Sequence, residues 1–238
     1  MLSKKLIAKS LLFSFLFFSL AFADSAEVEN QPSPNRLYQV ELIIYSQLSE
    51  EALQSEEWPF VENKISLPAS TIEFQNPSFT ASASYSLLSP RNFKLSAEAN
   101  QLKKDPHYKV LLHMAWQQPM IAGKTMPPIH FMGGTAFDDR GNPLSLTSQE
   151  DFQNENLRWQ VNGMLTLAMR HYFDLHFNIL FTEPASQITR FVSEGNLQNI
   201  EGDLAYFRVI QDRRTKSQEL NYIDSPLYGI LVEIFPVK

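Results

Sequence analysis

Apolar and polar side chains alternate along several segments of the chain, as expected for β-strands with one buried face. In 37–45, Tyr38 and Val40 share one face, whereas Gln39 and Glu41 lie on the other. The same alternation predicts strands at 107–116, 159–170, 172–182, 205–211 and 229–235. Such half-buried strands favour antiparallel pairing, because parallel sheets are usually covered on both faces.

The clearest pair of strands lies in the second half of the chain. In 172–182 every second residue from Phe173 to Phe181 is apolar, and polar residues stand between them. Since 159–170 alternates as well, we expect a hairpin that turns near Arg170, or one continuous strand with a bulge there.

Two segments predict helix instead. Residues 50–57 suit a short helical turn that ends at Trp58, because the following proline disfavours a helical residue before it. Apolar residues fall near helical spacing in 89–104, where Ser89 can cap the helix and Pro90 suits its first position.

The remaining segments lack regular periodicity. We expect an irregular connection at 61–88, loop with one hairpin at most within 117–158, and a loop at 211–226. Together the elements predict an α+β fold over a single domain, 37–238, with a mostly antiparallel sheet and one or two helices.

The first residues have the features of a secretory signal peptide. The segment 1–23 has three lysines and no acid at its start, an apolar run at 11–20, and Ala21 and Ala23 before a cleavage site at Asp24. A retained membrane anchor is the alternative, but the ten-residue run is shorter than the ~20 residues that span a bilayer. We therefore predict export to the periplasm of a Gram-negative-type cell.

Composition narrows the class of the mature chain, which begins with a flexible spacer at 24–36. Cleavage takes the formal net charge from −6 to −9, because the signal peptide contains three lysines and no acid. An acidic chain disfavours unspecific nucleic-acid binding, which depends on Lys and Arg. The absence of cysteine excludes a lipoprotein anchor, disulfides and thiol catalysis. No later segment reaches spanning length, so we expect a mature protein without a membrane span.

No motif in the sequence indicates catalysis. The five histidines form no H-E-x-x-H, G-x-S-x-G is absent, and the Gly133-Gly134 pair lacks the rest of a phosphate-binding loop. A serine triad of another order stays open, as does acid/base chemistry on glycan, which needs two carboxylates at a fixed separation. Solvated surface acids are the alternative for the candidate carboxylates Asp174, Glu219, Asp224 and Glu233. We predict no catalytic, cofactor or metal site.

The aromatic residues divide into core and surface candidates. In 107–116 every second residue from Tyr108 to Trp116 is apolar, so Trp116 is expected in the core. Trp58 and Tyr222 fall outside the predicted strands and helices, where a ring could stack on sugar or peptide.

Four stretches carry distinctive patterns in order along the chain. They are YQVELIIY at 38–45 with EEWP at 56–59, HYKVLLHMAWQQP at 107–119, NGMLTLAMRHYFDLHFNILF at 162–181, and RRTKSQELNYIDSPLYGILVEIFP at 213–236. Together they resemble the CsiV family of periplasmic peptidoglycan-binding proteins, and they span nearly the whole mature chain.

This resemblance implies a protein that associates with peptidoglycan and supports its assembly. It implies action on a lipoprotein activator of a peptidoglycan synthase rather than catalysis. Two alternatives stay open: a scaffold that binds only a protein partner, and a glycan-acting enzyme.

The closing motif departs from the family pattern. Asn221 and Ser225 stand where the family usually has two histidines, and a residue is inserted within the hairpin pattern at 169–172. A metal site or pH response that depends on those histidines is therefore not expected here.

The candidate ligand-binding residues are Trp58, Arg213, Arg214, Tyr222 and Asp224. The two arginines could pair with carboxylates of stem peptides, and Tyr222 could stack. The alternative is that the arginines are solvated and Tyr222 packs beneath its loop.

Overall fold

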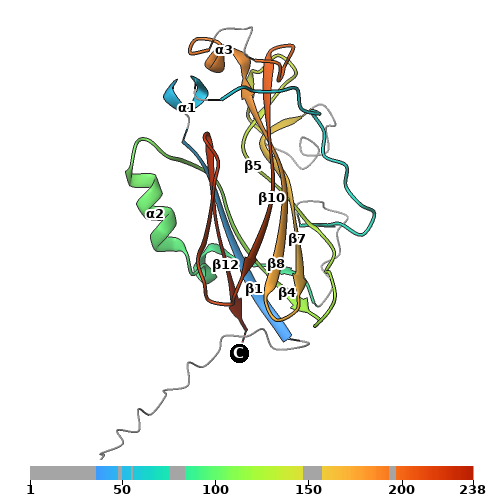
Figure 1. Cartoon of the computed structure of the whole chain (residues 1–238). Helices are drawn as coiled ribbons and strands as arrows, with labels where there is room; N and C mark the ends of the chain where they lie inside the picture. The colour runs from blue at the N-terminus through green and yellow to red at the C-terminus, as the bar shows by residue number, and fades with distance from the viewer. Residues whose placement is uncertain are drawn as a thin grey trace, which may run out of the picture.

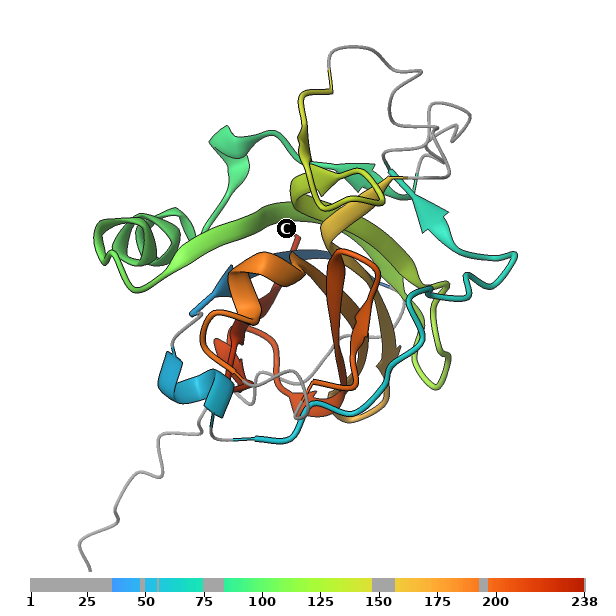
Figure 2. The same cartoon turned by 90° about the horizontal axis from the view of Figure 1, so that it is seen from above.

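The computed structural model describes residues 36–47, 50–54, 56–74, 84–146, 157–192 and 197–237. Their strands form two β-sheets that face each other, as Figure 1 shows from the side and Figure 2 from above. The predicted signal peptide and residues 24–35 of the predicted spacer lie outside these ranges, whereas Arg36 begins the first strand. No helix of the described segments is long and apolar enough to cross a membrane.

Sheet I has five strands. In order across the sheet they are β11 (Asn221–Asp224), β12 (Tyr228–Pro236), β1 (Arg36–Ser46), β4 (Lys109–Met120) and β3 (Ser86–Leu87).

Sheet II contains the predicted hairpin. Its order is β2 (Ile72–Glu73), β5 (Ile129–Phe137), β7 (Arg158–Met169), β8 (Phe173–Pro184), β10 (Leu204–Thr215) and β9 (Ile200–Glu201), with β6 (Pro143–Leu144) paired to β5. Between the described strands, β2 with β5 is the one parallel pair, so the expected antiparallel α+β class is confirmed.

Helices are short. They are α1 (Glu50–Gln54), α2 (Ser96–Lys104) and α3 (Ala185–Ile188), with a 3-10 turn at Pro90–Asn92. The helix predicted over 89–104 therefore starts later than expected. Ser89 makes no side-chain capping bond, and Phe93 has an extended backbone that separates the 3-10 turn from α2.

One apolar core lies between the sheets. The alternating residues of β8 from Phe173 to Phe181 are buried there, and Trp116 of β4 is fully buried as predicted. Aromatic rings cross the space between the sheets: Tyr38 meets Phe173 edge-to-face at 5.0 Å. Such contacts between large rings contribute beyond the area they bury.

The prediction that β1 is half-buried is wrong. Gln39 and Glu41 are buried although they face away from the shared core. The cause is α2, which packs against that face of sheet I through a second cluster that includes Ile43, Leu95 and Ala99. A sequence cannot show from alternation alone that a distant helix will cover the polar face.

A bulge in β4 explains a further difference from the prediction. In β4 the register shifts where Leu111 lies, so that Val110 pairs with Tyr45 and packs toward α2, whereas Leu112 contacts the shared core. The predicted single face from Tyr108 to Trp116 is therefore split between two clusters. Bulges place one extra residue on one strand and so shift the alternation.

Residues 117–158 contain more strand than expected. β4 continues to Met120, and β5 pairs with β7 along most of its length. The Gly133-Gly134 pair is a bulge within β5 rather than a loop turn: Gly134 has a φ of 73°, which favours glycine. A Cβ on Gly133 would lie 2.9 Å from the carbonyl oxygen of Leu111.

The end of the chain also contains more strand than predicted. The predicted loop at 211–226 is mostly strand, because β10 runs on to Thr215 and β11 follows after a short turn. In contrast, the described parts of 61–88 hold only the two-residue strands β2 and β3, so the irregular connection predicted there is confirmed for those parts.

Candidate functional site

A groove of about 560 Å³ crosses the outer face of sheet II close to the β7–β8 turn. Two rows of opposing side chains run across the strands there. The first row is Ala168, Asp174 and Arg214, and the second is Thr166, His176 and Asp212. We call the surface formed by these six residues and Arg213 the charged groove.

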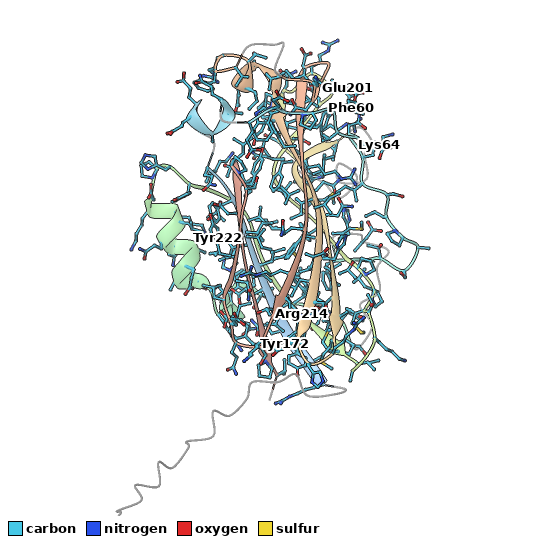
Figure 3. All side chains as sticks on the ribbon, viewed as in Figure 1. Phe60, Lys64, Tyr172, Glu201, Arg214 and Tyr222 are labelled. Carbon is cyan, nitrogen blue, oxygen red and sulfur yellow. The ribbon has the colours of Figure 1, made fainter. Side chains whose placement is uncertain are left out.

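Arg214 and Asp174 form the ion pair of the first row. The Nε of Arg214 donates to Oδ1 of Asp174 at 2.7 Å, and the arginine side chain remains 64% exposed. This hydrogen bond and the charge of Asp174 raise the pKa of Arg214, so its guanidinium stays protonated. In Figure 3, Arg214 and Tyr172 lie close together at this end of the molecule.

The second row holds a histidine–carboxylate pair. Nδ1 of His176 lies 2.7 Å from Oδ1 of Asp212, and both side chains are exposed. Thr166 stands opposite His176 on the neighbouring strand. The groove therefore presents cationic and anionic groups side by side.

Arg213 points from β10 toward sheet I. Its Nε donates to Oδ1 of Asn221 at 3.0 Å. The amide of Asn221 is buried and donates to Oγ1 of Thr215 and to the carbonyl of Glu219. Asn221, which departs from the family pattern, thus fixes the turn between β10 and β11 and holds Arg213 by one nitrogen.

The two arginines keep donors available. Both are engaged through Nε, and within the described part of the chain their terminal Nη atoms make no hydrogen bond or ion pair with other side chains. A guanidinium can bind a carboxylate through two parallel N–H bonds, so these atoms suit an anionic ligand.

The groove is open because the segments that cover the rest of this outer face do not reach it. Farther along the same outer face, Leu180 and Tyr206 are buried because Val61 and Ile65 pack over them. No described segment covers the rows at the groove in this way. Small residues on β7 and charged residues on β8 and β10 occupy that end instead.

Tyr222 and Asp224 form a separate cluster on the outer face of sheet I. The hydroxyl of Tyr222 donates to Oδ1 of Asp224 at 2.6 Å, and Gln47 donates to the same oxygen. Burial, the bond to Asp224 and a bond with Tyr45 raise the pKa of Tyr222. Tyr45 reaches across Gly229, where a Cβ would lie 2.2 Å from its ring. Tyr222 is in a strand, not in the expected loop.

Trp58 takes a structural position. Its Nε1 donates to the carbonyl of Leu53 at 2.9 Å, and its ring packs edge-to-face on Phe207 at 5.0 Å. The side chain contacts the shared core. A ring held in this way offers little of its face for stacking on a ligand.

The five predicted site residues therefore lie in three places. Arg213 and Arg214 come together in the charged groove, Tyr222 and Asp224 lie on sheet I, and Trp58 packs near α1. Sequence analysis missed Asp212 and His176 as groove residues. The alternation in β8 did place Asp174 and His176 on the polar face of that strand. The local sequence pattern could not predict, however, that β10 would pair with β8 and bring Asp212 next to them.

The other candidate carboxylates have local roles. Glu219 accepts from the backbone N–H of Lys216, and Asp174 is paired with Arg214. Burial is the main cause of a raised pKa at Glu233, next to the charges of Glu98 and Glu41. Among the described residues, no three His, Asp or Glu side chains group in a way that could hold a metal ion.

Comparison with known protein families identifies the family of this chain. The model of a family described as "Peptidoglycan-binding protein, CsiV" matches residues 6–237, almost the whole chain. No curated protein and no solved structure matches.

Proposed function

Because the chain belongs to the CsiV family of peptidoglycan-binding proteins, we propose that it binds peptidoglycan directly through the charged groove. The observation that supports this most is the pair of adjacent arginines that border the groove, each engaged through Nε and with terminal nitrogens that bind no other described side chain. Stem peptides of peptidoglycan carry carboxylates, and the bidentate geometry of guanidinium matches them.

Charge distribution supports a local site. The chain has a formal net charge of −6, so its overall field repels an anionic polymer. Binding must then depend on a few cations at a fixed position. Arg213 and Arg214 meet this requirement because Asn221 and Asp174 orient them on neighbouring residues of one strand.

We extend the proposal to the wider role that the family resemblance implies. The protein is exported after cleavage of 1–23, resides in the periplasm, and supports wall assembly through a lipoprotein that activates a peptidoglycan synthase. It acts by binding, not by catalysis. In the groove, the acidic and basic side chains are paired with one another, which suits ligand recognition better than proton transfer.

Sedimentation with protein-free sacculi tests the proposal. We expect mature protein, residues 24–238, to pellet, and R213E/R214E to lose at least tenfold in retention. K103E/K104E is the matched control, because it makes the same charge change on exposed lysines at the end of α2. Circular dichroism of each variant checks that the fold is kept.

The other outcomes point to the alternatives. Failure of the wild-type protein to pellet would overturn direct binding and favour a scaffold that contacts only a protein partner. Release of soluble muropeptides would indicate a glycan-acting enzyme. Equal losses of retention in R213E/R214E and K103E/K104E would show that the groove is not the binding site and that retention depends only on the overall charge of the protein.

A further inference from the structure

We infer that the charged groove recognises a peptide element carrying an ammonium and a carboxylate within about one residue of each other, not the glycan strand. This inference rests on the proposed function and specifies the part of the polymer that is bound. It gives Asp212 and His176, which the sequence did not single out, a role in specificity.

The arrangement of charges is the first argument. Arg214 and Asp212 are two positions apart on β10 and face the same side of sheet II, so their backbone positions are about 7 Å apart. One presents a cation and the other an anion to the same groove. A ligand with both charges at a similar spacing can satisfy both, whereas a purely anionic ligand would meet repulsion at Asp212.

The unused atoms are the second argument. Asp212 is 83% exposed and meets His176 through Oδ1 alone. Its Oδ2 has no partner among the described residues, so it can accept from an ammonium. Arg214, which faces the same side of the sheet, keeps its Nη donors for a carboxylate. Thr166, next to His176, adds a hydroxyl that can donate or accept.

The lining of the groove is the third argument. Proteins bind sugar rings by placing aromatic faces against them, and the groove's lining residues are threonine, alanine, leucine, aspartate, histidine and arginine. Of the aromatic residues first considered for stacking, Trp58 packs on Phe207 and Tyr222 lies on sheet I. Charge recognition is therefore favoured over ring stacking.

Chemically modified sacculi test the inference. Acetylation of their free amines removes the ammonium and leaves the carboxylates, whereas amidation of their carboxyl groups removes the carboxylates. Peptide-free glycan strands lack both. We expect wild-type retention to fall at least fivefold on amine-acetylated sacculi, at least tenfold on amidated sacculi, and to be absent on peptide-free glycan.

The variant D212N connects the effect to the groove. It should bind unmodified sacculi several-fold more weakly than wild type and should no longer respond to amine acetylation. D203N, which neutralises an exposed aspartate elsewhere, should keep the full response.

The outcomes separate the two proposals. If unmodified sacculi bind but amine acetylation has no effect, or if peptide-free glycan binds equally well, this inference fails and direct wall binding stands. A response to acetylation that persists in D212N also overturns it. If unmodified sacculi do not bind at all, the proposed function itself fails.

Discussion

Two histidine–carboxylate pairs on opposite outer faces of the molecule have nearly the same length and different surroundings. His113 Nε2 lies 2.8 Å from Glu41, and His176 Nδ1 lies 2.7 Å from Asp212. Glu41 is fully buried beneath α2, whereas Asp212 is 83% exposed. The comparison shows that covering, not residue type or distance, separates a structural pair from one available to a ligand.

Glu41 is bound on every side. Besides His113, its carboxylate accepts from the backbone N–H groups of Lys94 and Leu95 at 2.7 and 2.9 Å, immediately before α2. Leu95, the N-cap residue, makes no side-chain cap of its own. A carboxylate from β1 therefore satisfies donors at the start of the helix and holds α2 on sheet I.

The largest expected effect is the loss of this buried carboxylate. We expect E41A to lower the free energy of unfolding by about 3 kcal/mol, because it leaves buried donors unsatisfied and frees the start of α2. Urea denaturation measures the change. D212A on the exposed face is the control, and we expect it to cost less than about 0.5 kcal/mol. Equal costs would contradict the comparison.

The same carboxylate predicts a pH dependence. Burial alone raises the pKa of Glu41, but bonds from His113, Lys94 and Leu95 outweigh it and bring the pKa below the ordinary 4.5. Between the lowered pKa of Glu41 in the folded protein and its ordinary pKa in the unfolded chain, the unfolded chain binds more protons. Stability therefore rises with pH in this range. We therefore expect stability from Glu41 to be complete above about pH 4.5 and lost as pH falls through its folded pKa.

Urea titrations of wild type and E41Q between pH 2 and 7 measure this linkage. The difference in unfolding free energy between the two proteins should shrink as the pH falls. A constant difference would mean that hydrogen bonding to Glu41 does not depend on its charge.

A second buried acid should respond in the opposite direction. Glu183 accepts from Gln160 at 2.8 Å and from the hydroxyl of Tyr228 at 3.4 Å. Burial nevertheless raises its pKa above 4.5, because these two bonds and the charge of Lys109 compensate only in part. Its ionised form therefore destabilises the fold as pH rises past the ordinary carboxyl range.

We expect E183Q to stabilise the protein at pH 7 by about 1 kcal/mol, because the amide keeps an acceptor and carries no charge. At pH 4 the gain should largely vanish, since Glu183 is then protonated in the folded state. Thermal or urea unfolding at both pH values measures this. A loss of stability at pH 7 would show that the ionised carboxylate is needed.

The contrast between buried and exposed pairs also explains how far the sequence predicted the molecule. The alternation of apolar and polar residues reflects which face of a strand is buried. It therefore predicted the β7–β8 hairpin and the core position of Trp116 correctly. It failed for Glu41, because α2, more than fifty residues later, covers that face, and for β5, where Gly133 and Gly134 interrupt the alternation with a bulge.

The arrangement of the candidate site residues was predictable only in part for the same reason. Arg213 and Arg214 were proposed together because adjacent cations in an acidic chain stand out, and both line the groove. Their partners depend on register: Asp174 meets Arg214 only because β8 and β10 pair with that alignment. Tyr222 was misplaced because a four-residue strand, β11, is too short for its alternation to be distinguished from a loop.

The smallest expected effect concerns the exposed pair itself. We expect H176N to change the free energy of unfolding by less than about 0.5 kcal/mol, since exposed ion pairs contribute little and are screened by salt. The same variant should weaken retention on sacculi at low salt, because it removes the partner that orients Asp212. H113N is the counterpart on sheet I. It should lower the free energy of unfolding and leave retention on sacculi unchanged, because Glu41 is buried and lies on the other sheet from the charged groove. If both variants affected stability equally, burial would not be what distinguishes the two faces.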